Sequence, residues 1–171
     1  MTVATELLSD AFVRVKEIVH EAAADLTPEQ LAFQPDPAAN SIAWLVWHLT
    51  RVQDDHVSEL AEKPQAWTDL GWRERFALPF GPGATGYGQN AGQVASLEGV
   101  DAERLLGYHD DVHARTVAFL SGSGGHHLDR VVDASWDPPV TAAVRLVSVV
   151  SDDLQHAGQA AYVRGLLERA R

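Results

Sequence analysis

Hydrophobic residues recur at intervals of three and four along most of the chain, which is the spacing of amphipathic helices. One such stretch runs from about Thr5 to Ala24, and a second follows Ser41 and ends near Glu62. A third follows Asp101, and a fourth extends from about 140 to 169. The second stretch places apolar side chains at Ile42, Leu45, Leu49, Val52 and Leu60. The pattern predicts four long helices and an all-α four-helix bundle.

Capping and turn residues predict where these helices begin. Ser41 is the expected N-cap of the second helix, and Thr27 with Pro28 predicts a short turn of helix before a Pro-rich linker. Long connections after the second and third helices allow a topology other than simple up-and-down.

The remaining segments depart from helical periodicity. Residues 64–93 are rich in Gly, Pro and aromatic residues, and we expect a loop that is functional or packed over the core. Residues 128–136 alternate as a short strand would, and Asp137-Pro138-Pro139 is expected to begin the last helix. The expected apolar positions of that helix are Val144, Val147, Leu154, Ala161 and Leu166.

Composition places the chain among ordinary globular proteins. Its 171 residues fit one domain over residues 1–171, with 46% hydrophobic and 22% charged residues. A formal net charge of -11 disfavours nucleic-acid binding, because that affinity rests on cation–phosphate contacts. The sequence contains neither an apolar run of membrane-spanning length nor a basic start typical of a signal peptide. We therefore expect a cytoplasmic protein that does not bind membranes.

The chain has no cysteine, so a metal must be held by nitrogen and oxygen ligands. Asp152 and His156 are four apart in the last helix and share one face, and His48 on the second helix is a candidate third ligand. Such a set suits Zn, Ni, Fe or Mn and leaves positions for water or substrate. The alternative is an ordinary surface ion pair between Asp152 and His156, beside a hydrogen-bonded core histidine.

Other histidines offer further candidates. His109 and His113 are four apart in the third helix, which taken alone is the stronger metal-binding pattern, and the alternative is a half-exposed helix face, which the adjacent acidic residues favour. His56 could line the cavity of His48, although a polar core residue is the simpler interpretation, and His20 is expected at the surface. We expect His126 and His127 to be solvated. The glycine-rich segment 81–88 lacks a lysine and does not join a strand to a helix, so a phosphate loop is not expected.

Two short motifs stand out, Asn-Ser-Ile-Ala-Trp-Leu-Val-Trp-His-Leu at 40–49 and Asp-Asp-Leu-Gln-His-Ala-Gly-Gln at 152–159. The first resembles the second-helix signature of DinB-like (YfiT-like) four-helix metalloproteins, and the second resembles their fourth-helix signature. The resemblance implies up-down-down-up topology and a Zn or Ni ion held by His48, Asp152 and His156. Most members carry His at the position of Asp152, and the maleylpyruvate isomerase branch carries Glu, which is one methylene longer.

The resemblance also implies a relationship to thiol-dependent enzymes, namely mycothiol-dependent maleylpyruvate isomerase and bacillithiol S-transferases. The expected function is activation of an external low-molecular-weight thiol, such as mycothiol or bacillithiol, toward a small-molecule electrophile. Candidate walls for the electrophile are Trp44, Trp47, Trp67 and Trp72, each of which is otherwise a core residue. A non-catalytic metal- or ligand-binding protein and a metal-dependent hydrolase remain alternatives. A homodimer is compatible with the resemblance.

Overall fold

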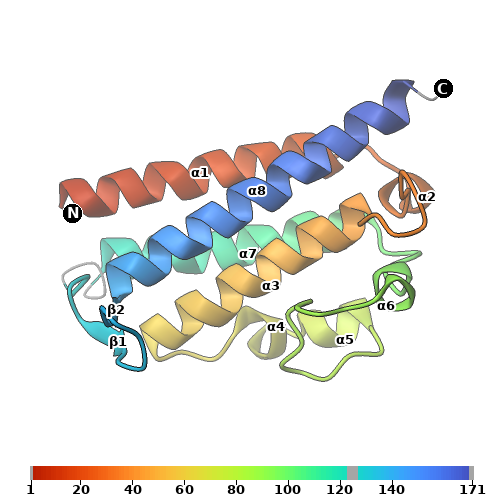
Figure 1. Ribbon diagram of the computed structural model, residues 1–171. Helices are drawn as coiled ribbons and strands as arrows, with labels where there is room; N and C mark the ends of the chain where they lie inside the picture. Colours follow the sequence, from red (N-terminus) through yellow and green to blue (C-terminus); the bar gives the residue numbers. More distant parts are fainter. Residues whose placement is uncertain (1, 123–126, 170–171) are drawn as a thin grey trace.

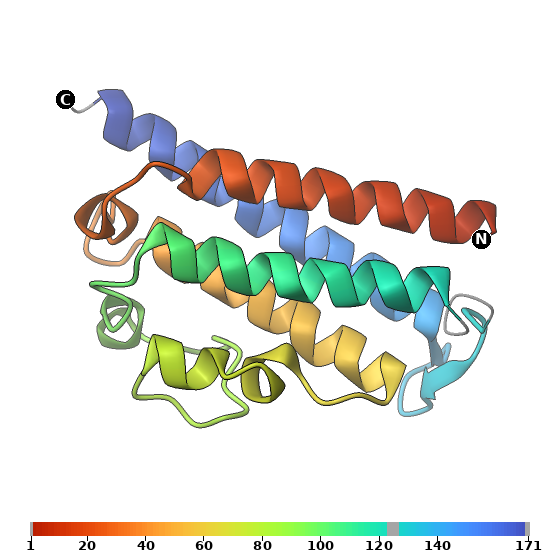
Figure 2. The same ribbon diagram turned by 180° about the vertical axis from the view of Figure 1, so that it is seen from behind.

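The computed structural model describes residues 2–122 and 127–169, and the expected all-α fold is confirmed. The four long helices are α1 (Val3–Ala23), α3 (Ile42–Ala61), α7 (Ala102–Ser121) and α8 (Ala142–Arg169). Each of α1 and α3 packs against both α7 and α8, so the four helices enclose one core. Their directions run up, down, down and up in chain order (Figures 1 and 2), as the resemblance implied.

The predicted capping residues act as caps. The Ser41 hydroxyl accepts a hydrogen bond from the Trp44 backbone N–H at the start of α3. Thr27 caps the short helix α2 (Pro28–Leu31), which has Pro28 at its first position. Each cap satisfies a backbone N–H that the helix leaves unpaired and contributes about 1 kcal/mol.

The segment after α3 is more ordered than the expected loop. It contains the three short helices α4 (Ala66–Asp69), α5 (Trp72–Phe76) and α6 (Ala91–Ala95). Rings from α4 and α5 pack at 5.3–5.9 Å against Tyr108 of α7. Burial of these rings stabilises the helical turns of this segment. The Gly and Pro residues, which disfavour helices, had indicated a loop.

A β-hairpin precedes α8. Strand β1 (Val131–Asp133) pairs antiparallel with β2 (Val140–Thr141). The strand-like stretch is confirmed in part, whereas Asp137-Pro138-Pro139 lies in the hairpin turn and does not begin the helix as predicted. The helix starts only at Ala142, because Val140 and Thr141 pair with β1.

The apolar stripe predicted for α8 faces outward. Val144 is 50% exposed, Val147 is 59% exposed and Leu154 is 39% exposed. The buried face of α8 consists of Ala142, Leu146, Val149, Asp153, Ala157, Ala160 and Val163. The helix carries large apolar residues on two faces, and the inner face also carries three alanines and one aspartate, so the large apolar residues alone did not identify it.

Asp54 is the centre of a buried polar network beneath α4. Its carboxylate accepts hydrogen bonds from the backbone N–H groups of Ala66 (2.9 Å) and Trp67 (2.8 Å). The Tyr108 hydroxyl donates to the same carboxylate at 2.8 Å, and the buried Arg51 guanidinium lies 3.5 Å from it. Burial, and then the Asp54 charge, raises the pKa of Tyr108 well above its usual value, so its hydroxyl remains a donor. The network joins α3, α4 and α7.

His109 lies on the inner face of α7 and is 0% exposed, so the predicted half-exposed position is wrong for this residue. Both ring nitrogens lack a hydrogen-bond partner among the described residues. Burial, and then the neighbouring His113, lowers the pKa of His109 from 6.5 to about 3. The folded protein therefore holds this imidazole in its neutral form.

This burial predicts acid sensitivity. Between pH 6.5 and about 3 the unfolded chain binds a proton at His109 that the folded chain does not, so the free energy of unfolding falls as pH drops. The loss approaches about 1.4 kcal/mol per pH unit within that window and vanishes above it. Urea unfolding of wild type and His109→Leu at several pH values measures the difference. Equal pH slopes in the two proteins would refute the assignment.

Candidate metal centre

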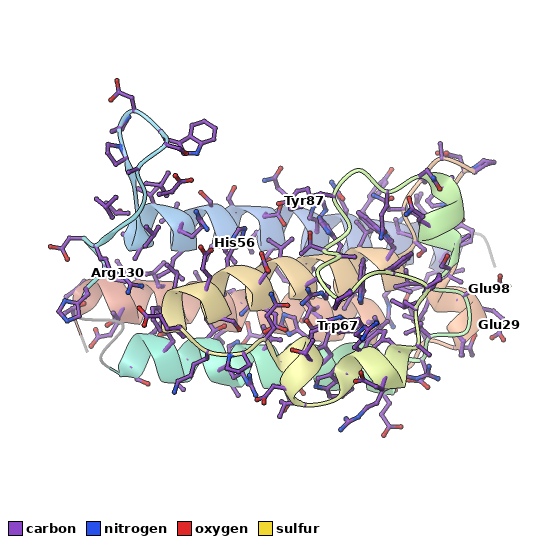
Figure 3. All side chains as sticks on the ribbon, turned by 90° about the horizontal axis from the view of Figure 1, so that it is seen from below. Glu29, His56, Trp67, Tyr87, Glu98 and Arg130 are labelled. Atoms are coloured by element: carbon purple, nitrogen blue, oxygen red, sulfur yellow. The ribbon has the colours of Figure 1, made fainter. Side chains whose placement is uncertain are left out.

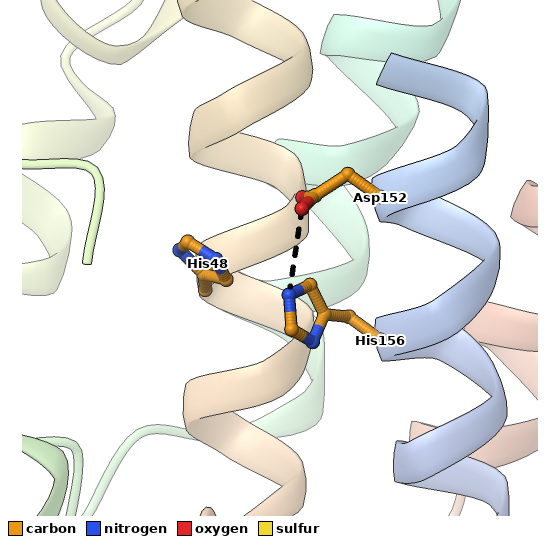
Figure 4. A group of neighbouring side chains, drawn as sticks. All are labelled: His48, Asp152 and His156. Carbon is orange, nitrogen blue, oxygen red and sulfur yellow. Dashed lines mark ion pairs between the residues drawn. The ribbon is translucent and has the colours of Figure 1, made fainter. Parts of the chain in front are cut away.

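Three side chains from two helices converge on one point, as Figure 4 shows. His48 projects from α3, and Asp152 and His156 project from successive turns of α8. One potential ligand atom from each lies within 4.8 Å of the other two. The His156 Nε2 atom is 3.7 Å from the Asp152 Oδ1 atom, and the two imidazole centroids are 4.7 Å apart. The structure thus brings together the residues singled out in the sequence, and they could hold a metal ion.

Hydrogen bonds fix the orientation of both imidazoles. The Nδ1 atom of His48 donates to the Thr85 carbonyl oxygen, and that of His156 to the Gln159 Oε1 atom at 3.0 Å. Oxygen acceptors at Nδ1 place the hydrogen there and leave the Nε2 lone pairs for the shared point. An oxygen acceptor at the second nitrogen is typical of histidines that bind metals.

The electrostatics also fit a cation. Burial lowers the pKa of His48, which is 3% exposed, so its ring is neutral at pH 7 and its lone pair is available. The Oδ2 atom of Asp152 is buried with no hydrogen-bond partner among the described residues. A buried carboxylate oxygen normally has a donor or a cation beside it, and a divalent ion at this point would supply the latter. Two imidazoles and a carboxylate form a three-ligand set that leaves a position open.

The absence of a side chain at Gly86 makes room for the His48 ring and its hydrogen bond to Thr85. Gly86 has φ +106°, and a Cβ atom there would lie 2.5 Å from the His48 Nδ1 atom. The preceding carbonyl oxygens of Ala84 and Thr85 accept hydrogen bonds from Arg51 and His48. The Gly-rich segment therefore presents carbonyl oxygens to α3, a role that its sequence did not indicate.

Gly86→Ala is expected to weaken metal binding. Positive φ alone costs a non-glycine residue about 1–2 kcal/mol, and the added methyl group also displaces the Thr85 carbonyl from His48. Loss of the hydrogen bond that orients a metal-binding histidine lowers metal affinity about 10–100-fold. Gly88→Ala is the matched control, because Gly88 has φ +70° and no atom within 4 Å of its added Cβ. Calorimetric titration that gave equal metal affinity for the two variants would disprove the role of this glycine.

Gln159→Leu tests whether the hydrogen bond from His156 to Gln159 supports metal binding. Removing the Gln159 amide frees the His156 ring to rotate, and we expect metal affinity to fall about 10–100-fold with little change in thermal stability. Gln155→Leu is the control, since Gln155 bonds only within its own helix, to Ser151. Indistinguishable metal titrations of the two variants would rule out an orienting role for Gln159.

Aromatic rings border the site on the α3 side. The Trp44 ring stacks on His48 with centroids 4.6 Å apart, and its Nε1 atom donates to Gln89 at 2.7 Å. Tyr87 stands perpendicular to His48 at 5.3 Å and is 67% exposed. Burial, and then Asp152, raises the pKa of Tyr87. All four predicted walls lie in the main core cluster, and among them Trp44 stacks on His48.

The remaining histidines lie apart from this group. Arg145 lies 3.2 Å from His56 Nδ1, which accepts its hydrogen bond; burial, and then Arg145, lowers the pKa of His56. His20 lies 2.7 Å from Asp110 and is half-buried. His113 is partly buried, and His127 is exposed as expected. His126 falls outside the described residues.

Two supporting groups were missed by sequence reasoning. Thr85 acts through its backbone, and backbone acceptors have no residue signature. Gln159 lies three positions after His156, a spacing at which side chains of one helix meet, and this could have identified it.

Among the described residues, no helix is long and apolar enough to cross a membrane.

Comparison with known proteins agrees with this architecture. A conserved protein from Enterococcus faecalis, known from a crystal structure, is 32% identical, with 98% of each chain covered and a TM-score of 0.89. No curated protein matches the sequence. The family model described as the DinB superfamily matches residues 11–160. With a match over most of its length, the chain belongs to the DinB superfamily.

Proposed function

We propose that this protein is a divalent-metal-dependent enzyme that activates a low-molecular-weight thiol toward a small-molecule electrophile. The observation that carries the proposal is the convergence of two oriented Nε2 atoms and one carboxylate within 4.8 Å. His48, Asp152 and His156 would hold the ion, with Zn or Ni the best match to imidazole and carboxylate ligands. Superfamily membership supports the assignment to a metalloprotein.

The thiol that the bound ion would activate must come from outside the protein. When bound, a divalent ion acidifies a coordinated thiol and supplies a nucleophile at neutral pH. The chain has no cysteine to serve as that thiol, so the sulfur must come with a second molecule. Mycothiol or bacillithiol is the co-substrate suggested by the resemblance.

The chain's own residues position and shield the reacting groups. The His48 and His156 rings are held by Thr85 and Gln159. Trp44 stacks on His48 and limits the access of water from that side. The exposed Tyr87 ring borders the site, where an apolar electrophile can rest against it. These contacts would place an electrophile on Tyr87 next to a thiol at the ion.

Metal removal and restoration test the proposal. Wild-type protein loaded with Zn or Ni is incubated with a chromogenic electrophile and, separately, with mycothiol, bacillithiol or glutathione. We expect conjugation above the uncatalysed rate with at least one thiol, loss of that excess after chelation, and recovery when the ion is restored.

The outcomes separate the alternatives. Catalysis that persists after complete chelation would refute the metal-dependent mechanism. Metal-dependent hydrolysis of an ester without any thiol would replace the proposal with an ion-bound water mechanism. A metal-loaded protein that turned over no thiol and no ester would leave a non-catalytic metal-binding protein.

A further inference from the structure

The outer face of α8 differs from the rest of the surface. Every exposed position of this helix from Val144 to Tyr162 is uncharged, although the chain carries a net charge of -11. Val147 is 59% exposed and Tyr162 is 65% exposed. The exposed face of α1, by comparison, carries Glu6, Asp10, Arg14, Glu17 and Glu21. An uncharged face of this length in an acidic protein is typical of a protein–protein contact.

The spacing on this face is that of a helix–helix seam. Val144, Val147, Ser151, Leu154 and Gly158 recur at alternating intervals of three and four, as the a and d positions of paired helices do. These positions are separate from the inner face that packs against α1 and α3. In Figure 1, α8 lies in front of α1 and α3 with no described element over it. Within residues 2–122 and 127–169, no element of the chain covers the seam.

A projection and a hollow lie at opposite ends of the same face. The β1–β2 hairpin, at the N-terminal end of α8, stands out beyond the outer side of the helix (Figure 3), and Trp136 in its turn is 66% exposed. Near the other end, a hollow of about 790 Å³ lies between residues 35–40 and α8. Its α8 wall includes Leu154, Gly158 and Tyr162. The two features are separated by much of the length of α8.

From this arrangement we infer that α8 is the interface of a symmetric homodimer whose two-fold axis passes near Ser151. Val144 lies seven residues before Ser151 and Gly158 seven after it, so an antiparallel pairing sets Val144 against Gly158 of the partner subunit. The same rotation carries the hairpin with Trp136 toward the partner's hollow. A protruding ring and a hollow whose walls include Leu154 and Tyr162 are complementary in a self-pairing interface.

Electrostatics favour a second copy as the occupant. Two chains of charge -11 repel each other over most of their surfaces, and the uncharged outer face of α8 lets the two helices meet without bringing carboxylates of this face together. Gly158 has no atom within 4 Å of an added Cβ, so the seam has room at this position for a side chain from the partner. The inference stands independently of the proposed function.

Sedimentation of the full chain tests the interface. We expect wild type to show twice the monomer mass of 18.6 kDa, and Gly158→Arg to be a folded monomer because it places a charge in the seam. Ala114→Arg, at an exposed position of α7, should remain a dimer. Trp136→Ala should weaken dimerisation about 30-fold, which is typical of losing a central aromatic anchor. Circular dichroism confirms that each variant is folded.

A cross-link tests the register. Ser151→Cys would place the only thiol of each chain near the two-fold axis, and mild oxidation should give a covalent dimer, whereas Ala114→Cys should not cross-link. A wild-type protein that stays monomeric at every concentration would overturn the inference and leave this face to a different protein. A dimer unaffected by Gly158→Arg would also overturn it, because the contact would then lie elsewhere.

Discussion

His156→Ala is expected to eliminate stoichiometric metal binding while leaving the helical fold intact. The variant removes one of the two imidazoles, whose Nε2 atom lies 3.7 Å from Asp152 Oδ1. It leaves one imidazole and one carboxylate, too few to close a three-ligand set. Loss of a hydrogen-bond partner of a ligand histidine alone lowers metal affinity about 10–100-fold. Loss of the ligand itself should therefore lower metal affinity at least about 100-fold. Thiol-dependent turnover should fall to the uncatalysed rate.

Calorimetric titration with Zn or Ni and circular dichroism check this expectation together. His20→Ala is the matched control, because His20 is also a half-buried histidine on a long helix but pairs with Asp110, away from the site. The control should bind one ion per chain as wild type does. If His156→Ala bound the metal as tightly as His20→Ala, the ligand assignment would be wrong.

Asp54→Ala is expected to destabilise the fold by about 3–5 kcal/mol, the range for removing one partner of a buried ion pair. The buried Arg51 would lose its carboxylate, and the N–H groups of Ala66 and Trp67 would lose their acceptor. Remaining bonds from Arg51 to Tyr108 and Gln65 offset part of the loss but do not neutralise the charge.

Urea unfolding with two companion variants isolates the effect. Asp54→Asn keeps an oxygen acceptor but removes the charge, so we expect an intermediate loss. Asp55→Ala removes the neighbouring carboxylate, whose hydrogen bond comes from Gln65, and should cost less than about 1 kcal/mol. A loss for Asp54→Ala no larger than that for Asp55→Ala would show that the network contributes little to stability.

Local patterns predicted the helices and the ligands well where a single helix contains the information. The apolar positions of α3 from Ile42 to Leu60 are all buried as predicted. The four-residue spacing of Asp152 and His156 placed both on one face of α8, and His48 on the facing helix was a candidate third ligand that the resemblance supported. Spacing alone left the ion-pair interpretation open.

The remaining features depend on contacts between distant segments. Asp54 resembles any aspartate in a helix until Ala66, Trp67 and Tyr108 surround it. The orientation of α8 could not be fixed from periodicity, because the helix carries large apolar residues on its exposed face as well as on its buried one, and Asp153 lies on the buried face. The orientation of His48 depends on the backbone carbonyl of Thr85, which any residue type could supply. In the sequence, only the neighbouring Gly86 indicates this contact.

X-ray absorption of the Zn-loaded protein tests the central claim, the shared metal centre, most directly. The account predicts one ion per chain with two imidazole nitrogens and a carboxylate oxygen at about 2.0–2.2 Å, and no sulfur, since the chain has no cysteine. Adding the thiol substrate should introduce one sulfur at about 2.3 Å. An ion bound without two imidazoles, or no stoichiometric ion at all, would contradict the account.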